Sequence, residues 1–410
     1  MKREMELIAS LDMGTTKVTA MIGERRGTGI RVIGVGTTAS EGLKQGIVVD
    51  INRAAKSVSH AVKEAERMAG ITVKGFNVGV AGEHIRSMNS RGVVAIPNLG
   101  VEISDEDVFR AINAAQNFTV PFDREIIHTL PSEYIVDDQR GIREPSGMFG
   151  SRLEARVHVV TASRAALDNI AKTLSSAGVE LDDLIFEPLA SSSAVLTEAE
   201  QELGVMLIDI GGGTSDVMIF IDRGVVASGV IGLGGNNVTS DVAYGLRTAQ
   251  QCAEDIKVRH GCALSTMVAP DEMVEVPGIG DRKSRVVSRQ LLAGIIEPRM
   301  KELFALIDDQ ITKNDFKRSI GAGVVITGGA SMLENTRELA EQVFDLPVKI
   351  GTPIAVEGLV EGVSHPMFAT GVGLLLYDGN IEKRGGCEKS HRGRWHNSFS
   401  QIKRAIASFI

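Results

Sequence analysis

Short apolar runs separated by polar turns dominate the first eighty residues of the chain. The runs LIASLDMG, KVTAMIGE and IRVIGVGTT are strand-like, and a helix is expected from about Ile51 to Met68. The run FNVGVAG then has the strand pattern again. The order of elements predicted for this part is therefore three strands, a helix and a fourth strand.

The opening pattern recurs in the second half of the chain. At VMLIDIGGGTSDVMIFID another apolar run ends in Asp-x-Gly, and a second strand follows directly. Later, the short and fully apolar run VVI is expected to be a central strand followed by a glycine turn and a helix. The chain looks duplicated, and its 410 residues favour two lobes or several subdomains over one core.

A segment with its own pattern, residues 83–162, separates the two copies. It contains several strand-like runs and a helix expected from Asp105 to Phe118. Ser104 is the candidate N-cap of that helix, and Asp107 completes a variant of the capping box. The segment is predicted to be a small α/β subdomain inserted into the first lobe.

Composition and charge narrow the classes of function. The net charge of −8 gives no general attraction to nucleic acid, and no stretch approaches the roughly 18 apolar residues of a membrane-spanning helix. The start, MKREMELIASLDMG, does not suit a cleavable signal peptide. Three cysteines without paired metal spacing indicate a reducing compartment and no structural zinc. We therefore expect a cytosolic body that does not bind nucleic acid.

Two glycine loops carry the candidate chemistry, DMGTTK from Asp12 to Lys17 and DIGGGTSD from Asp209 to Asp216. Glycine lets backbone N–H groups approach phosphate oxygens, and the threonines and Lys17 add donors and a positive charge. The two first aspartates are hard carboxylates that can hold Mg²⁺ through water. The pair predicts a clamp on one triphosphate, whereas either loop alone is equally an ordinary β-hairpin.

Other phosphate-binding motifs are absent from the sequence. There is no G-x-x-x-x-G-K-[ST] run and no G-x-G-x-x-G between a strand and a helix, so the P-loop and Rossmann interpretations lose their main support. A third glycine motif, Thr327 to Ser331, follows the strand VVI. Its glycines suit an adenine lying against the backbone, although a tight strand-to-helix turn explains them equally well.

The motifs occur in an order that resembles one superfamily. The first loop, FEPLASS, the second loop, AEDIK and TGGASML match the nucleotide-binding motifs of the actin, Hsp70 and sugar-kinase superfamily. The resemblance implies an α/β, actin-like (ribonuclease H-like) duplicated two-lobe fold with a nucleotide cleft, and ATP with Mg²⁺ as cofactors.

The same resemblance assigns roles to single residues. Asp12 and Asp209 are the implied magnesium-side acids, and Glu187 is the implied carboxylate that orients the attacking water. An acid before proline can equally cap the following helix, so that alternative stays open. The implied nucleotide contacts are Gly14, Thr15, Thr16, Lys17, Gly211, Gly212, Gly213 and Thr214 at the phosphates, Glu254 and Lys257 at the ribose and adenosine, and Gly328, Gly329 and Met332 near the base.

Within the superfamily, the chain resembles the FtsA family of bacterial cell-division proteins. The insert has the position of the relocated FtsA subdomain, and HTLPSEYIVDDQRGIREPSGM, ELGVMLIDIGGGTSDV, IKVRHGCAL and IIEPRMKEL are similar to that family. The implied division is subdomain 1A (1–82 and 163–198, with helix 366–379), 1C (83–162), 2A (199–231 and 319–365), 2B (232–318), a flexible linker (380–393) and a membrane-targeting amphipathic helix (394–410).

The last residues indicate a membrane contact independently of the resemblance. The apolar residues there follow spacings of four, three, four and three, which place them on one narrow helix face. They are Trp395, Phe399, Ile402, Ile406 and Phe409. Residues 380–410 hold seven Lys or Arg against two Glu, which suits insertion at an anionic lipid interface. The alternative is a helix that folds back onto the body.

The resemblance implies a function in cell division. The expected protein binds ATP with weak or slow ATPase activity at most, forms filaments, and lies peripherally on the cytoplasmic side of the inner membrane at the division septum. There it would tether the FtsZ ring and recruit later divisome proteins through subdomain 1C. The implied site for the FtsZ C-terminal tail is near Arg285, Arg289, Arg299 and Lys301, although a solvated helix face explains these charges almost as well.

Two other functions fit the same superfamily. A sugar or acetate kinase would need a catalytic acid and a polar sugar pocket in the cleft, and no convincing run of that kind is present. An Hsp70-like chaperone would continue into a β-rich peptide-binding domain, for which the length leaves no room.

Overall fold

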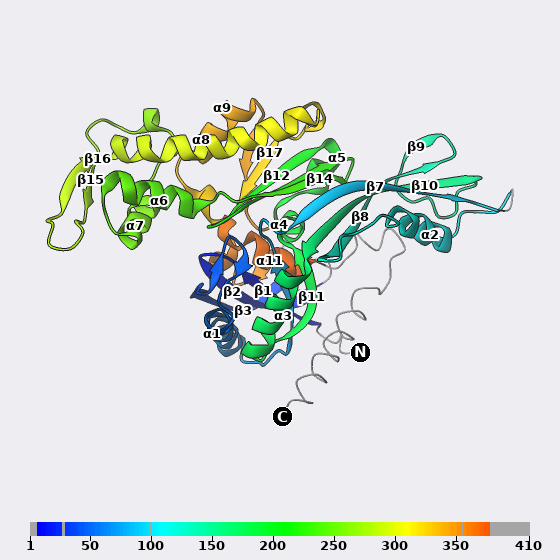
Figure 1. The fold of residues 1–410 in the computed structure, drawn as a ribbon, viewed down its shortest axis with the longest axis horizontal. Helices are drawn as coiled ribbons and strands as arrows, with labels where there is room; N and C mark the ends of the chain where they lie inside the picture. The colour runs from blue at the N-terminus through cyan, green and yellow to red at the C-terminus, as the bar shows by residue number, and fades with distance from the viewer. Residues whose placement is uncertain (1–5, 27–28, 98–99, 355, 378–410) are drawn as a thin grey trace.

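The computed structural model describes residues 6–26, 29–97, 100–354 and 356–377, and Figure 1 shows two lobes with an insert. We name them lobe 1 (6–82, 163–198 and 356–377), lobe 2 (199–354) and the insert (83–162). No helix within the described ranges is both long enough and apolar enough to span a bilayer. The predicted residues of the linker and of the terminal amphipathic helix lie outside the described residues.

Lobe 1 contains a six-stranded sheet in the order β11-β6-β1-β2-β3-β19. The predicted order of three strands, a helix and a strand is confirmed, with a short β4–β5 hairpin added. The strands of lobe 1, with the separate β4–β5 hairpin included, are β1 (Leu7–Met13), β2 (Lys17–Arg26), β3 (Gly29–Ala39), β4 (Leu43–Lys44), β5 (Ile47–Val48), β6 (Gly75–Val80), β11 (Glu180–Phe186) and β19 (Val356–Gly358). Its helices are α1 (Ile51–Ala69), α3 (Arg164–Ala177), α4 (Glu187–Val195), α10 (Val360–Val363), η4 (Pro366–Phe368) and α11 (Ala369–Leu376).

Lobe 2 repeats this plan with a five-stranded sheet in the order β14-β13-β12-β17-β18. In both lobes a three-stranded antiparallel meander is extended by a parallel strand beside its first strand. The strands are β12 (Val205–Ile210), β13 (Ser215–Ile221), β14 (Gly224–Ile231), β17 (Val324–Thr327) and β18 (Val348–Ile350). The strand predicted at VVI is central, between β12 and β18.

Helices and a small hairpin complete lobe 2. Figure 1 shows α6, α7, α8 and the β15–β16 hairpin extending away from lobe 1. The elements are α5 (Glu198–Leu203), α6 (Gly235–Leu246), α7 (Gln250–His260), η1 (Ser265–Met267), β15 (Met273–Val276), β16 (Arg285–Ser288), α8 (Arg289–Lys313), η2 (Lys317–Ser319), η3 (Gly329–Met332) and α9 (Thr336–Phe344).

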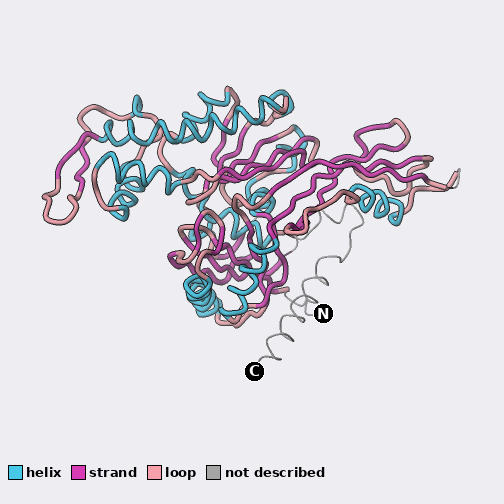
Figure 2. Tube along the Cα trace, viewed as in Figure 1, coloured by secondary structure: helices cyan, strands magenta, loops and turns pink. Residues whose placement is uncertain are grey.

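The insert is a four-stranded antiparallel sheet, in the order β7-β10-β8-β9, with one helix on one face. Its elements are β7 (Arg86–Ala95), α2 (Asp105–Ala115), β8 (Arg124–Val136), β9 (Gln139–Ile142) and β10 (Arg152–Ser163). The capping box of Ser104 and Asp107 is confirmed. The helix ends before the predicted Phe118, whose N–H instead bonds the Gln116 carbonyl in a tight turn. In Figure 2 the strands of the insert lie beside those of lobe 2, where β14 contacts β7 and β8.

Two features of the chain path differ from the expected boundaries. The chain returns to the sheet of lobe 1 at β19, which pairs with β3 from residue 356, ahead of the helix expected from residue 366. The segment expected as one helix over 366–379 is a 3₁₀ turn followed by α11, and Gly379 lies outside the described residues. Pairing with β3 is a main-chain interaction that no side-chain pattern in residues 356–358 indicates.

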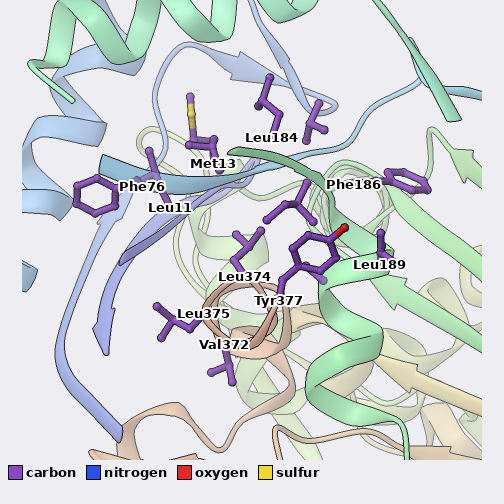
Figure 3. Packing of buried hydrophobic residues seen from close by; sticks show 14 of the residues in the cluster. Leu11, Met13, Phe76, Leu184, Phe186, Leu189, Val372, Leu374, Leu375 and Tyr377 are labelled. Atoms are coloured by element: carbon purple, nitrogen blue, oxygen red, sulfur yellow. The ribbon is translucent and has the colours of Figure 1, made fainter. Parts of the chain in front are cut away.

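A crossing of α4 and α11 lies in the core of lobe 1. Leu189 of α4 and Val372, Leu374 and Leu375 of α11 are fully buried there (Figure 3). An added Cβ on Gly373 would overlap the carbonyl oxygen of Ala190. The two helices therefore approach at a distance that only glycine at position 373 allows.

Two helical glycines provide a matched test of this packing. We expect Gly373→Ala to destabilise the protein by about 1–3 kcal/mol, because overlap with a backbone oxygen outweighs the better helix propensity of alanine. Gly294→Ala in α8, where an added Cβ meets nothing within 4 Å, should instead be neutral or stabilise by up to about 1 kcal/mol. Urea unfolding of both variants measures the difference, and equal midpoints would contradict the close crossing.

Candidate functional site

A cavity of about 440 Å³ lies where the β1–β2 loop of lobe 1 faces the β12–β13 loop of lobe 2. The structure brings to it every acid and every nucleotide contact that the sequence indicated. These are Asp12, Gly14, Thr15, Thr16, Lys17, Glu187, Asp209, Gly211, Gly212, Gly213, Thr214, Glu254, Lys257, Gly328, Gly329 and Met332. Residues separated by more than 300 positions in the sequence thus share one cleft.

The two glycine loops touch across the cleft. A Cβ on Gly213 would lie 2.6 Å from the Thr15 Oγ1, and one on Gly212 would overlap the Thr16 side chain. None of the glycines from 211 to 213 has a positive φ. These glycines are therefore required by the closeness of the loops and not by a left-handed backbone.

The cleft buries several carboxylates around one lysine. Burial raises the pKa of Asp12 to about 6; Lys17 opposes that shift and Asp209 adds to it. Burial also lowers the pKa of Lys17, although both aspartates favour its charged form. The Lys17 Nζ donates a 2.6 Å hydrogen bond to the Met367 carbonyl and lies 4.0 Å from the centre of the Phe368 ring. The lysine is held in place without any ligand.

Asp209 is oriented by hydroxyl groups from two elements of lobe 1. Ser191 of α4 donates to its Oδ2 at 2.6 Å, and Thr370 of α11 donates to the same oxygen at 3.1 Å. Burial raises the pKa of Asp209, and these hydrogen bonds limit the rise. Sequence reasoning missed both partners, because no local motif relates α4 or α11 to Asp209.

Asp216 is a further acid of the cavity to which sequence reasoning gave no role. It is almost fully buried, its Oδ1 has no hydrogen-bond partner, and its Oδ2 accepts from Thr214 at 3.4 Å. Burial raises its pKa well above the usual range, and Asp209 adds to the shift. The signal was present in the sequence, since Asp216 is the last residue of the DIGGGTSD loop.

Glu187 points into the cavity and does not cap a helix. It is the first residue of α4, whose N-terminus has no hydrogen bond from a side-chain cap. A Cβ on Gly79 of β6 would lie 3.0 Å from the Glu187 Cγ. Burial raises the pKa of Glu187 well above its usual range, and Asp12, Asp216 and Asp209 add to the shift. The geometry therefore favours a cleft role over the helix-capping alternative.

Near α7 the cavity is lined by both polar and apolar side chains. The Lys257 Nζ donates to Glu254 Oε2 at 2.7 Å and to Thr239 Oγ1 at 2.9 Å, which ties α7 to α6. Met300, Leu333 and the half-exposed Met332 line the cavity nearby. A flat ring could lie between these apolar side chains and the backbone at Gly328, while the Glu254–Lys257 pair faces a polar group.

The residues fit a divalent cation that keeps its water shell. Among the described residues no three His, Cys, Asp or Glu side chains are close enough to hold a metal directly. However, Asp12, Asp209 and Asp216 are buried together beside Lys17 in the cavity, and one Asp216 oxygen lacks a partner. Such uncompensated carboxylates suit hydrated Mg²⁺, which gives up its water reluctantly.

The four basic residues expected to bind a partner are on β16 and α8, and none of them lines this cavity. Arg289 already pairs with Glu272 at 2.6 Å and with Glu334, and Arg299 pairs with Asp241 at 2.7 Å and with Glu302. Arg285 donates to the Leu246 carbonyl at 2.8 Å, and Lys301 is exposed. The structure thus shows two of the four charges neutralised within the chain, which the helical pattern did not reveal.

The raised pKa of Asp12 predicts a dependence of stability on pH. Between about pH 4 and 6 the folded state binds more protons at this site than the unfolded chain, so the nucleotide-free protein loses stability as pH rises. We expect Asp12→Asn to reduce this loss by an amount on the order of 1–3 kcal/mol. Asp138→Asn, at a fully exposed carboxylate, is the control. Urea unfolding at several pH values gives the slopes, and an unchanged slope for Asp12→Asn would contradict the prediction.

Two family models match parts of the chain. The model described as "Cell division protein FtsA" matches residues 206–373, and the "SHS2 domain inserted in FTSA" matches residues 82–161. The second match covers the segment that forms the four-stranded sheet and α2. The matched segments account for most of lobe 2 and for the insert.

Curated relatives match nearly the whole chain. The cell division protein FtsA of Pseudomonas aeruginosa is 47% identical over 373 residues, which cover 91% of this chain and 89% of that protein. The FtsA protein of Escherichia coli K12 is 39% identical, with 95% of this chain and 94% of that protein covered. The FtsA protein of Bacillus subtilis is 37% identical, with coverages of 91% and 83%.

Solved structures with low sequence identity share the fold. The PilM-PilN type IV pilus biogenesis complex matches with a TM-score of 0.64 at 16% identity and covers 90% of this chain and 97% of that one. MreB5 of Spiroplasma citri bound to ADP matches with a TM-score of 0.55 at 15% identity, with coverages of 93% and 98%. The predicted actin-like fold is confirmed. With relatives this similar over this much of its length, the chain belongs to the FtsA family of cell-division proteins.

Proposed function

We propose that this chain is an ATP-binding, self-assembling adaptor that attaches the FtsZ ring to the cytoplasmic face of the inner membrane at the division septum. The observation that supports it most is the cleft in which two glycine hairpins meet across buried acids. The structurally similar MreB5 was solved bound to ADP, which fits a nucleotide in this place. Family membership in FtsA supports the cell-division role.

Different residues of the cleft would bind the phosphates and the magnesium ion of Mg-ATP. The backbone N–H groups of the two loops and the hydroxyls of Thr15, Thr16 and Thr214 would donate to phosphate oxygens. Lys17 would exchange part of its contact with the Met367 carbonyl for a phosphate. A bound Mg²⁺ would offset phosphate charge, and the oxygens of Asp12 and Asp209 would accept hydrogen bonds from its water shell.

The state of Glu187 fits slow turnover of ATP. Its pKa is raised well above the usual range because it is buried beside other carboxyls. A raised pKa disfavours the ionised carboxylate, which is the form that accepts a proton from an attacking water. We therefore assign it a water-positioning role that operates only when the charge of the cleft is balanced, which supports weak or slow ATPase activity at most.

Nucleotide binding and membrane attachment are connected through assembly. The amphipathic helix that the sequence predicts for residues 394–410, which lie outside the described residues, would by itself give weak affinity for an anionic bilayer, whereas a filament would present many such segments at once. ATP closes the cleft, the closed form assembles, and assembly holds the chain on the membrane. The insert and its surface then remain available for later divisome proteins.

Liposome pelleting tests this connection. We expect the full chain to pellet with anionic liposomes severalfold more in Mg-ATP than without nucleotide, because assembly multiplies the anchors. A chain truncated before Trp395 should stay in the supernatant in both conditions, and Asp12→Asn should pellet as the nucleotide-free protein does. Equal pelleting of full and truncated chains would contradict the membrane anchor. Equal pelleting of the full chain with and without ATP would contradict the nucleotide dependence.

The surface of β16 and α8 is our proposed site for the acidic FtsZ tail. Arg289 and Arg299 are engaged with carboxylates of this chain, so they would shape the surface more than attract a peptide. Arg285 and Lys301 form no ion pair with a carboxylate of the described residues and remain able to attract one from a peptide. The charge available to the tail is therefore smaller than the four basic residues suggest.

Charge reversal separates these contributions. We expect Arg285→Glu combined with Lys301→Glu to weaken binding of a labelled FtsZ C-terminal peptide about tenfold or more at low salt, because two attractions become repulsions. Lys313→Glu at the far end of the same helix is the matched control. Fluorescence anisotropy measures the affinity, and a double variant that binds as tightly as the control would remove the site from β16 and α8.

A further inference from the structure

The insert holds the edge strand of lobe 2. β14 is the outermost strand of the lobe 2 sheet, and side chains of β7 bond its backbone. Ser87 Oγ donates to the Ser228 carbonyl at 2.7 Å, and Asn89 Nδ2 donates to the Val226 carbonyl at 2.9 Å. On β10, His158 Nε2 lies 2.8 Å from the Ser228 Oγ. The insert thereby takes the place that a further strand would occupy in an extended sheet.

A second attachment lies at the turn from β13 into β14. The Arg143 guanidinium donates to the Ser132 carbonyl of the insert at 2.7 Å and to the Ile221 carbonyl of lobe 2 at 3.3 Å. Gly224, the first residue of β14, packs directly against Ser132. β14 is therefore attached to the insert at its first residue and in its middle.

The insert itself is fixed to lobe 1. Arg124 joins the two segments that connect the insert to lobe 1, because its guanidinium donates to the His84 and Thr161 carbonyls, each at 2.9 Å. His128 of β8 also accepts a 2.9 Å hydrogen bond from the Phe186 N–H at the end of β11. A movement of lobe 1 relative to lobe 2 must therefore act on the contact between the insert and β14.

The end of β14 leads directly into the nucleotide cleft. Four residues after Ser228, the Gly232 carbonyl accepts a 3.0 Å hydrogen bond from Gln45 Nε2 of lobe 1. The helix α6 then begins at Gly235, whose N–H bonds the Gly211 carbonyl at 2.9 Å, and Asn236 N–H bonds the Gly212 carbonyl at 2.7 Å. The strand held by the insert thus ends on the second glycine loop.

We propose that the insert is a clamp across the two lobes, so that nucleotide binding in the cleft and partner binding on the insert are thermodynamically linked through β14. This regulation rests on the proposed nucleotide-binding function. Closure of the cleft would move β14 and change its bonds to the insert, and a partner that favours one position of the insert would favour one state of the cleft. Such linkage is reciprocal, so each ligand changes the affinity of the other by the same factor.

The interface is built to break and form again. Most of the bonds named above join side chains to main-chain carbonyls, and beside them lies a groove of about 980 Å³ between the strands of the insert and the β13–β14 turn. Because the groove separates the walls there, side chains can exchange partners without opening a packed core. Arg143 and Arg223 line the groove from the insert and from lobe 2.

The test compares two sets of hydroxyl and amide deletions on the same strand. Ser87→Ala with Asn89→Ala removes two bonds to β14. Ser90→Ala removes an equivalent 2.7 Å bond on the opposite face of β7, where Ser90 Oγ donates to the Ala115 carbonyl of α2. Neither variant alters a residue that lines the cleft. The dissociation rate of a fluorescent ATP analogue is measured for both and for the unaltered chain, with Mg²⁺ present.

We expect the double variant to release the analogue about five- to thirtyfold faster than the unaltered chain, and Ser90→Ala to stay within about twofold. Release rates that are equal in all three proteins overturn the clamp and leave the proposed function intact. An unaltered chain that does not bind the analogue overturns both.

Hydrogen–deuterium exchange of the unaltered chain gives a second readout that needs no variant. We expect ATP to slow exchange of the backbone amides of β14 and of β7 together. Slower exchange confined to the glycine loops, with β7 unchanged, would show that the cleft does not act on the insert, and the clamp would be overturned.

Discussion

The structure depends on the contact of two glycine loops across a cleft that buries more acid than base. Thr15 and Thr16 of one loop pack on Gly213 and Gly212 of the other, so the lobes meet where the carboxylates gather. Burial raises the pKa values of Asp12, Asp209 and Asp216, which means that ionising these carboxyl groups in the cleft has an electrostatic cost. The proposed cation would relieve part of that cost, and Lys17 would balance phosphate charge. The charges that destabilise the folded protein would then favour binding of that ligand.

Most of the fold could be predicted because its signals are local. Apolar runs and glycine turns in the sequence predict the β1–β2–β3 meander, α1 and the second hairpin at DIGGGTSD. The capping box of Ser104 lies within four consecutive residues. The pairing of β19 with β3 was not foreseen. It is a contact between main chains more than 300 residues apart, and three residues carry no pattern that selects a partner strand.

The same distinction applies to the candidate site. The glycine loops, Glu254 and Lys257 were indicated by motifs, and the structure gathers them in one cavity. Ser191 and Thr370, which orient Asp209, were not indicated, since a hydroxyl on an apolar helix gives no sign of what it faces. The ion pairs of Arg289 and Arg299 could not be predicted from the sequence either. Their carboxylate partners come from other elements, so a helical projection shows only the arginines.

The position of the segment 366–377 has a consequence for biosynthesis. This late segment is bonded to strands of lobe 1 beside the cleft. The backbone carbonyls of Met367, Gly371 and Leu374 accept hydrogen bonds from the side chains of Lys17, Ser10 and Asn77, respectively. The first lobe, although five of its six sheet strands precede residue 187, lacks its edge strand β19 and the helix α11 until residues 356–376 leave the ribosome. A nascent chain therefore cannot complete this cavity before residues 366–377 have been synthesised.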